Sequence, residues 1–262
     1  MEKSDVRGGD TRRGLELLWG IRAAPRRGPK GRLDVSRLVQ AAIAIADAEG
    51  LAAVSTRRVA EAVGVSAMSF YTYVPDKAVL LDLMLDAAAG DESALPPEAE
   101  GPRDWREDVR GLAVAQRAWL LRHPWILEVT THRPGVGPQA IRTYDRMLSV
   151  FADLGLDEVE MDLCVTLLVD YVRGSVRNVV RARQVARDTG QSDEDWWREV
   201  GPVLAKVDLS PWPLAAHVGA VVGELYGTGD PERAFAFGLD RLLDGLDALI
   251  ARRGGVGSAP QA

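Results

Sequence analysis

Residues 55–77 read STRRVAEAVGVSAMSFYTYVPDK, two short helix-forming segments that meet at a glycine. Ser55 has a side chain suited to a helix N-cap, and Gly64 supplies the left-handed backbone that a tight turn needs. Ser66 then caps a second segment over residues 67–73. This order predicts a helix-turn-helix whose small shared core consists of Val59, Val63, Val65 and Phe70.

The outward face of the second segment is small, rich in hydroxyls and aromatic, and it suits a major groove about 12 Å wide. A merely solvated face would instead be rich in Glu, Lys and Gln. With the cap residue, the side chains expected at the DNA are Ser66, Ala67, Met68, Ser69, Tyr71, Thr72 and Tyr73. We expect phosphate contacts from residues that begin the two neighbouring helices, namely Thr56, Arg57 and Lys77.

The rest of the chain also has helical periodicity, and sustained alternating β-branched runs are absent from the sequence. Apolar residues between positions 35 and 46 share one helix face, and Gly50 ends that segment. Further helices are expected at 105–122, 138–154, 158–186, 193–207, 213–226 and 231–252. The sequence therefore predicts an all-α protein with a helix-turn-helix unit of three helices at 33–86, a larger helical bundle at 103–253 and a disordered tail at 254–262.

Charge is distributed unevenly along the 262 residues, which carry 32 Lys and Arg against 38 Asp and Glu, a net charge of −6. Residues 1–85 contain 13 Lys and Arg against 10 Asp and Glu, a net charge of +3. The remainder contains 19 Lys and Arg against 28 Asp and Glu, a net charge of −9. Such asymmetry is typical of an acidic protein that meets a polyanion at one end. A solvated basic linker is the alternative.

Residues 1–32 are expected to form a flexible basic arm, because two prolines and two glycines between positions 22 and 31 discourage a helix. A short apolar island at 15–21 is placed to dock on an unidentified surface. Three basic side chains would lie in an A·T-rich minor groove, or else act as a nonspecific electrostatic tether: Arg26, Arg27 and Lys30.

Several function classes are poorly supported. The one cysteine, Cys164, excludes an internal disulfide framework and is expected to be a small buried hydrophobe. His123 and His132 have no spaced carboxylate partner, so neither a metal nor a cofactor is predicted. No nucleophile-elbow, P-loop or zinc-protease motif is present, which argues against an enzyme. The polar N-terminus and the absence of a long apolar run predict a cytoplasmic protein.

At this point residues 36–81 resemble the N-terminal domain of the tetracycline-repressor (TetR) family. The resemblance implies the same phosphate contacts at Thr56 and Arg57, a groove-facing start at 67–69, further contacts at 71–73 and a clamp at Lys77. Two positions depart from the usual pattern: Tyr73 stands where many members have His, and Ala67 is too small to bond a base edge. Both bear on which operator is read.

Residues 103–252 resemble the tetracycline-repressor type of C-terminal domain, through LLRHPWI at 120–126 and PGVGP at 134–138. The resemblance implies a homodimer formed by the helices at 158–186 and 231–252, with intramolecular burial of both as the alternative. It also implies a ligand pocket, and the residues that qualify by type are Trp119, Trp125, Thr130, His132, Tyr144, Met147, Phe151, Leu168, Tyr171 and Trp197. Plain core packing is the alternative for each of them.

Together these features predict a homodimeric transcriptional repressor that a small hydrophobic ligand releases from a palindromic operator. Its paired recognition helices would enter major grooves about 34–36 Å apart. An activator or a ligand-independent regulator of the same fold is the first alternative. The second is a helical enzyme or a protein-interaction module with an incidental basic end.

Overall fold

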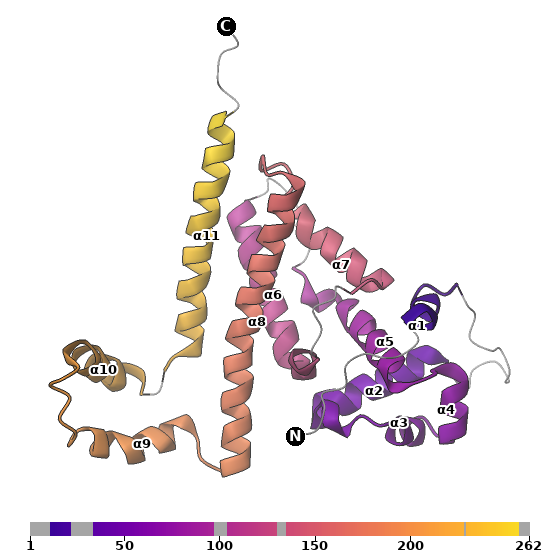
Figure 1. Ribbon diagram of the computed structural model, residues 1–262, viewed down its shortest axis with the longest axis horizontal. Coiled ribbons are helices and arrows are strands. Elements are labelled where there is room, and N and C mark those ends of the chain that lie inside the picture. Colours follow the sequence, from indigo (N-terminus) through magenta and orange to yellow (C-terminus); the bar gives the residue numbers. More distant parts are fainter. Residues whose placement is uncertain (1–10, 22–33, 97–103, 130–134, 228, 257–262) are drawn as a thin grey trace, which may run out of the picture.

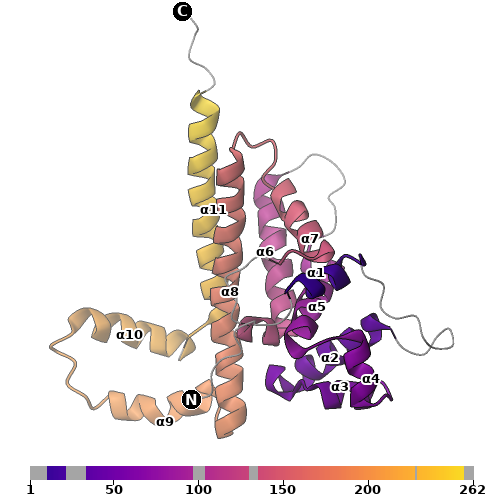
Figure 2. The same ribbon diagram turned by 45° about the vertical axis from the view of Figure 1, so that its right-hand side comes forward.

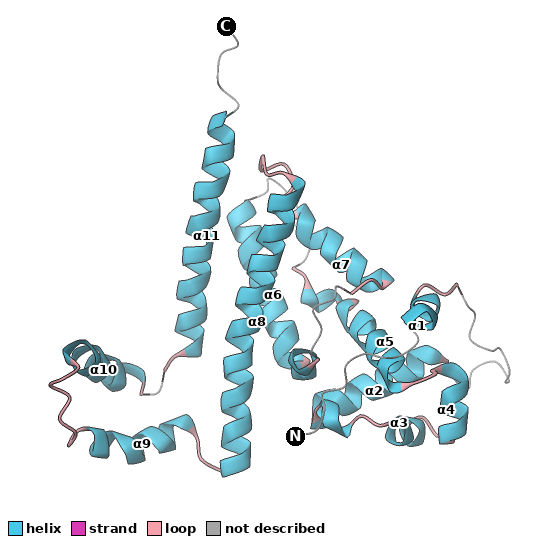
Figure 3. Cartoon of the chain, viewed as in Figure 1, coloured by secondary structure: helices cyan, strands magenta, loops and turns pink. Residues whose placement is uncertain are grey.

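The computed structural model describes residues 11–21, 34–96, 104–129, 135–227 and 229–256. Within these ranges the chain consists of helices joined by turns and contains no strand, as Figure 3 shows. None of the helices in these ranges is long and apolar enough to cross a membrane. The all-α prediction is confirmed.

The N-terminal unit contains four helices, α2 (Val35–Glu49), α3 (Thr56–Ala62), α4 (Ala67–Tyr73) and α5 (Lys77–Ala89). Each begins at a side-chain cap, namely Asp34, Ser55, Ser66 and Asp76. Such caps satisfy backbone N–H groups that have no partner inside the helix. The predicted helix-turn-helix is confirmed, with Val59 and Phe70 fully buried in its core.

The C-terminal helices are α6 (Trp105–Arg122), α7 (Pro138–Ser149), α8 (Glu158–Thr189), α9 (Asp193–Leu204), α10 (Pro213–Tyr226) and α11 (Pro231–Val256). Short 3-10 turns are η1 (Leu51–Ala53), η2 (Glu92–Ala94) and η3 (Pro124–Glu128). The bounds of α6 and α10 agree with prediction. Helix α8 continues past residue 186 until Gly190, whose φ of +68° ends it. Helix α11 continues past 252, so a disordered tail from 254 is wrong for its first three residues.

The predicted flexible arm is wrong for part of its length, because Thr11–Leu18 form helix α1. This helix lies against α5, with Gly14 buried at the contact and Leu17 and Leu18 packed on the core. Burial of this apolar face stabilises a helix that is too short to be stable alone in water. Residues 19–21 are also described and follow α1, whereas residues 1–10 and 22–32 of the predicted arm lie outside the described residues.

Helices α6 and α8 pack against each other at the centre of the larger bundle, and α11 lies along its outer edge beside α8 (Figures 1 and 2). Helix α7 lies between this bundle and α5. Three arginines of α6 bind acidic residues of α11: Arg106 pairs with Asp244 and Asp247, Arg110 with Asp240, and Arg117 with Glu232. Helices α9 and α10 project away from the bundle in both views, and none of the residues that the structure describes in them is buried.

Candidate nucleic-acid interface and internal cavity

The turn between α3 and α4 is held by backbone and side-chain contacts. Gly64 has a φ of +77°, and the next amide, of Val65, donates to the Ala60 carbonyl at 2.9 Å. The Ser66 hydroxyl accepts from the amide of Ser69 at 3.2 Å and lies 2.9 Å from the Ser69 hydroxyl. These contacts fix α4 as a rigid element on the outside of the N-terminal unit.

The exposed face of α4 consists of Ala67, Met68, Tyr71 and Thr72, with Met68 81% exposed. Two residues expected on this face are only partly exposed. Ser69 is tied to the cap, and Tyr73 packs against the core because it lies three residues after Phe70, on the same side of the helix. Fewer side chains are therefore fully available to a groove than the seven that the sequence predicts.

The expected phosphate contacts flank this face. The Thr56 hydroxyl lies 3.3 Å from the Tyr71 hydroxyl, so the start of α3 and the middle of α4 form one polar surface. Arg57 is exposed and pairs with Glu61 at 3.4 Å, whereas Lys77 is half-buried at the start of α5. Arg26, Arg27 and Lys30 lie outside the described residues, and their role stays a prediction.

A cavity of about 650 Å³ lies between α1, α5, α6, α7 and α8. Its walls are mainly apolar, and three of the residues predicted to bind a ligand line it: Trp119, Tyr144 and Met147. The size and the apolar lining are typical of a site for a small organic molecule.

The other described residues predicted to bind a ligand do not line this cavity. Phe151 and Leu168 are buried in the core, and Trp125 donates to Asp47. Tyr171 stacks on Phe235, and Trp197 of α9 packs against the backbone of α10 at Gly223 and Gly227. Thr130 and His132 lie outside the described residues.

Polar groups in the cavity wall are mostly bound to the protein itself. Gln116 donates to the Ala94 carbonyl at 2.6 Å, and Thr143 donates to that of Ala89 at 2.7 Å. The hydrogen bond from Tyr144 to Asp162, at 2.6 Å, raises the pKa of the tyrosine. Burial lowers the pKa of Arg173, the one guanidinium among the described lining residues.

Asp86 on α5 is a buried lining residue that holds the start of α7. One of its oxygens, Oδ1, accepts from the amides of Gln139 and Ala140 at 3.1 and 2.9 Å. Burial raises its pKa, although these two hydrogen bonds act in the opposite direction. A Cβ atom at Gly137 would come within 2.2 Å of the same oxygen, so only glycine fits there.

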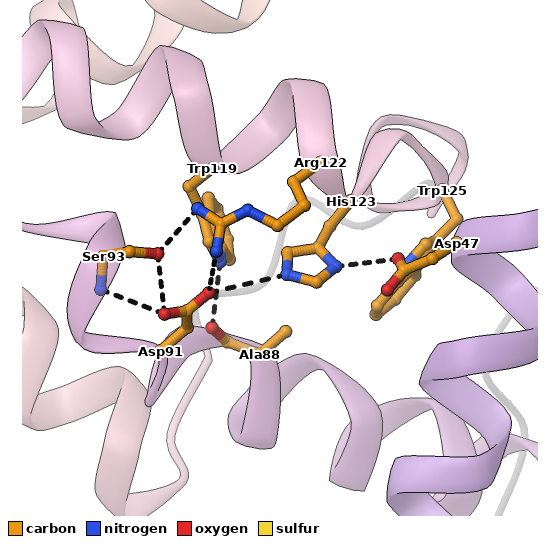
Figure 4. Close-up of polar contacts among 8 residues, drawn as sticks. All are labelled: Asp47, Ala88, Asp91, Ser93, Trp119, Arg122, His123 and Trp125. Carbon is orange, nitrogen blue, oxygen red and sulfur yellow. Dashed lines mark hydrogen bonds and ion pairs between the residues drawn. The ribbon is translucent and has the colours of Figure 1, made fainter.

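A polar cluster joins the cavity to the N-terminal unit (Figure 4). Trp119 faces the cavity on α6, and its indole donates to the Ala88 carbonyl at 3.0 Å. One helical turn later, His123 Nδ1 lies 2.7 Å from the carboxylate of Asp47 on α2. The Trp125 indole donates to the same carboxylate oxygen at 2.8 Å. We call Asp47, His123 and Trp125 the interdomain clasp.

Asp91, at the end of α5, supports the clasp from the other side. His123 Nε2 lies 3.7 Å from Asp91, and Arg122 and Ser93 bind the same carboxylate at 3.0 and 2.7 Å. Burial acts to raise the pKa of Asp91, but the hydrogen bonds of Ser93 and the charge of Arg122 outweigh it and lower the pKa. Sequence reasoning missed this cluster, because Asp47 and His123 are 76 residues apart.

In the described part of the chain, no group of three His, Cys, Asp or Glu side chains is arranged to hold a metal ion. Cys164 is buried on α8, as predicted, and burial raises the pKa of its thiol. Its surroundings are those of an inert core thiol rather than a reactive one.

Two families match the chain. The model of "Bacterial regulatory proteins, tetR family" matches residues 38–84, and that of "Tetracyclin repressor-like, C-terminal domain" matches residues 96–250. The chain belongs to the TetR family. It is accordingly a DNA-binding transcriptional regulator, and α3 and α4 are the helix-turn-helix of this TetR-family protein.

Similar proteins support the assignment to the TetR family along most of the chain. The HTH-type transcriptional repressor DrrR1 of Streptomyces coeruleorubidus is 40% identical over 253 residues, which cover 96% of this chain and 91% of DrrR1. Apo ActR from Streptomyces coelicolor shares the fold, with a TM-score of 0.69 at 24% identity over 87% of this chain and 100% of ActR. ActR in complex with actinorhodin gives a TM-score of 0.67 at 25% identity, over 85% of this chain and 99% of ActR.

Proposed function

We propose that this chain is a homodimeric repressor that leaves a palindromic operator when a small hydrophobic molecule binds the cavity. The proposal is carried by one observation: the cavity wall at Trp119 lies one helical turn from His123, which binds α2 of the DNA-binding unit. Two comparisons support the proposal: the 40% identical relative DrrR1 is named a transcriptional repressor, and ActR has been solved in complex with actinorhodin. The site of action is the cytoplasm, where bacterial DNA lies.

Unpartnered apolar side chains support the homodimer. Helix α8 exposes Val159, Leu163 and Leu167 at intervals of four residues, which form one stripe along the helix. The segment that contains α9 and α10 adds further exposed apolar residues, including Leu214 and Leu225 of α10 and Trp212 just before it. Exposed apolar surface of this extent marks an interaction site, and a twofold contact that includes α8 and α11 would bury it.

The clasp provides a route from the cavity to the DNA. A ligand that shifts Trp119 would also move His123, because both are on the last turns of α6. His123 and Trp125 hold α2 through Asp47, so α3 and α4 would move with α2. Ligand binding would then favour a dimer whose two recognition helices no longer match the groove spacing of about 34–36 Å.

The test measures operator binding by fluorescence anisotropy, with a labelled duplex taken from upstream of the chain's own gene. Full-length protein should bind at nanomolar concentration and be released by actinorhodin. The Tyr71→Ala, Lys77→Ala double variant should lose at least tenfold in DNA affinity, since groove and phosphate contacts both disappear. Full affinity of that variant would contradict the assignment of the DNA surface. Binding that no small molecule of a hydrophobic panel releases would contradict ligand control.

A further inference from the structure

Helix α1 lies outside both matched family segments, which begin at residues 38 and 96, yet it contributes to the cavity wall. Leu15 and Leu18 of α1 line the cavity together with Val79 and Asp82 of α5. The contact is close, because a Cβ atom at Gly14 would lie 3.5 Å from a methyl group of Val79. The cavity therefore includes a wall that the matched family segments do not supply.

This wall is thin. A separate groove on the outer side of α1 is lined by Leu15, Trp19 and Val136, and two of these residues, Leu15 and Val136, also line the cavity. A single layer of side chains thus divides the cavity from solvent at this place. The Trp19 indole donates to the Val136 carbonyl at 3.0 Å and ties the end of α1 to the segment before α7.

Helix α1 is shorter and less buried than the helices of the bundle. It has eight residues, Trp19 is 47% exposed, and Leu15, Leu17 and Leu18 are only half-buried. A helix of this length depends on its docking contacts, because it is too short to be stable alone in water. Opening of α1 therefore disrupts a smaller contact than separation of α6 from α8 would.

We propose that α1 is the lid of the effector cavity: a ligand enters past α1, which then closes and holds it through Leu15 and Leu18. Retention of a ligand by α1 rests on the proposed ligand-controlled function. Access to the cavity past α1 is a property of the chain itself, so the two are tested separately.

The first experiment needs no effector. In full-length protein, Ala94→Cys places a thiol at a cavity-lining position that is 1% exposed, and N-ethylmaleimide reports how often the cavity opens. Adding Trp19→Phe, which removes the hydrogen bond and keeps an aromatic ring, should raise the labelling rate about fivefold. Native Cys164 is the internal control, since it is only 4% exposed and does not line the cavity. Its rate should stay unchanged.

Two outcomes would overturn the lid. An unchanged labelling rate would mean that access runs elsewhere, for instance along the exposed Thr166 side of α8. An equal acceleration at Cys164 would mean that Trp19→Phe loosens the whole domain rather than α1.

The second experiment measures ligand contact with actinorhodin as the probe. Leu15→Ala and Leu18→Ala should each raise its Kd about tenfold, because each removes apolar surface that faces the cavity. Leu17→Ala is the matched control, since Leu17 packs on the core from the same helix without lining the cavity. Equal effects of all three variants would contradict direct contact. Failure of actinorhodin to bind the unmodified chain would count against the proposed effector and leave the labelling result to decide the lid.

Discussion

At the scale of single residues, Asp47 is the shared hydrogen-bond acceptor of the clasp. Its carboxylate binds two ring N–H groups, from His123 and Trp125, in a setting where His123 is only 8% exposed. Loss of a buried acceptor costs about 1–3 kcal/mol per unpaired donor. The same side chain stands between the ligand-binding and DNA-binding units, so its removal should affect communication as well as stability.

We expect Asp47→Ala to retain operator binding and ligand binding but to reduce the coupling between them. The measurement is the ratio of operator Kd with saturating effector to that without it, a ratio that is typically about 5–150 in allosteric proteins. Asp47→Asn keeps an oxygen acceptor and should preserve more of this ratio. If Asp47→Ala shows the same ratio as the unmodified chain, the clasp does not couple the ligand site to the DNA-binding unit.

Asp86 gives a prediction about pH. Because its pKa is raised in the folded chain, the folded state holds this proton more tightly than the unfolded state does. The stability contribution of Asp86 is therefore fully present below the ordinary pKa and declines as pH rises through the raised value. Asp86→Asn, which keeps an acceptor for the start of α7, should melt at a higher temperature than the unmodified chain at pH 7.

That advantage should shrink as pH falls from 8 to 4, because the native carboxyl, whose pKa is raised, takes up its proton earlier in that fall than an ordinary carboxyl would. Asp86→Leu is the control: it leaves two partly buried amides of α7 without an acceptor and should destabilise the fold by about 1–3 kcal/mol at either pH. If the difference in melting temperature between Asp86→Asn and the unmodified chain is the same at every pH from 4 to 8, the pKa of Asp86 is not raised.

At the scale of helices, α8 and α11 approach closely because Gly238 has no side chain. A Cβ atom there would lie 2.5 Å from the hydroxyl oxygen of Tyr171, which donates to the Phe235 carbonyl at 2.6 Å. We expect Gly238→Ala to push the two helices apart and lower the free energy of unfolding by about 1–3 kcal/mol.

Gly245 offers a matched control on the same helix. No atom lies within 4 Å of a Cβ atom built at this position, so Gly245→Ala should gain helix propensity, up to about 1 kcal/mol, without a clash. Urea denaturation of both variants measures the difference. Equal stability of the two would mean that Tyr171 moves aside without cost.

The predictability of the fold differs among elements for physical reasons. Helices α6 and α10 were predicted to the residue, since their end signals and apolar periods are local properties of the sequence: Asp104 caps α6, and Pro213 and Gly227 mark the ends of α10. Helix α1 was missed because its stability comes from docking on α5. For the aromatic residues, composition could not separate the cavity wall at Trp119 from the interhelical packing of Trp197, since that choice depends on partners distant in sequence.

At the scale of the whole molecule, the apolar stripe of α8 predicts a dimer in solution. Leu163→Glu with Leu167→Glu should give a monomer in sedimentation and lose most operator affinity, because each operator half-site then binds one chain alone. Val114→Glu is the control: this valine is exposed to a similar degree, 52% against 57% for Leu163, but lies on α6. A dimer that survives the double substitution would place the interface elsewhere.

Helix α5 belongs to both halves of the molecule. Its first residue, Lys77, is an expected phosphate contact, and six residues between Ala78 and Ala89 line the cavity. The whole helix is only about 20 Å long. A mutation in this wall would change the ligand preference and the grip on DNA together. New ligand specificities are therefore expected to evolve through α1, α7 and α8, where the cavity is free to change while the operator stays the same.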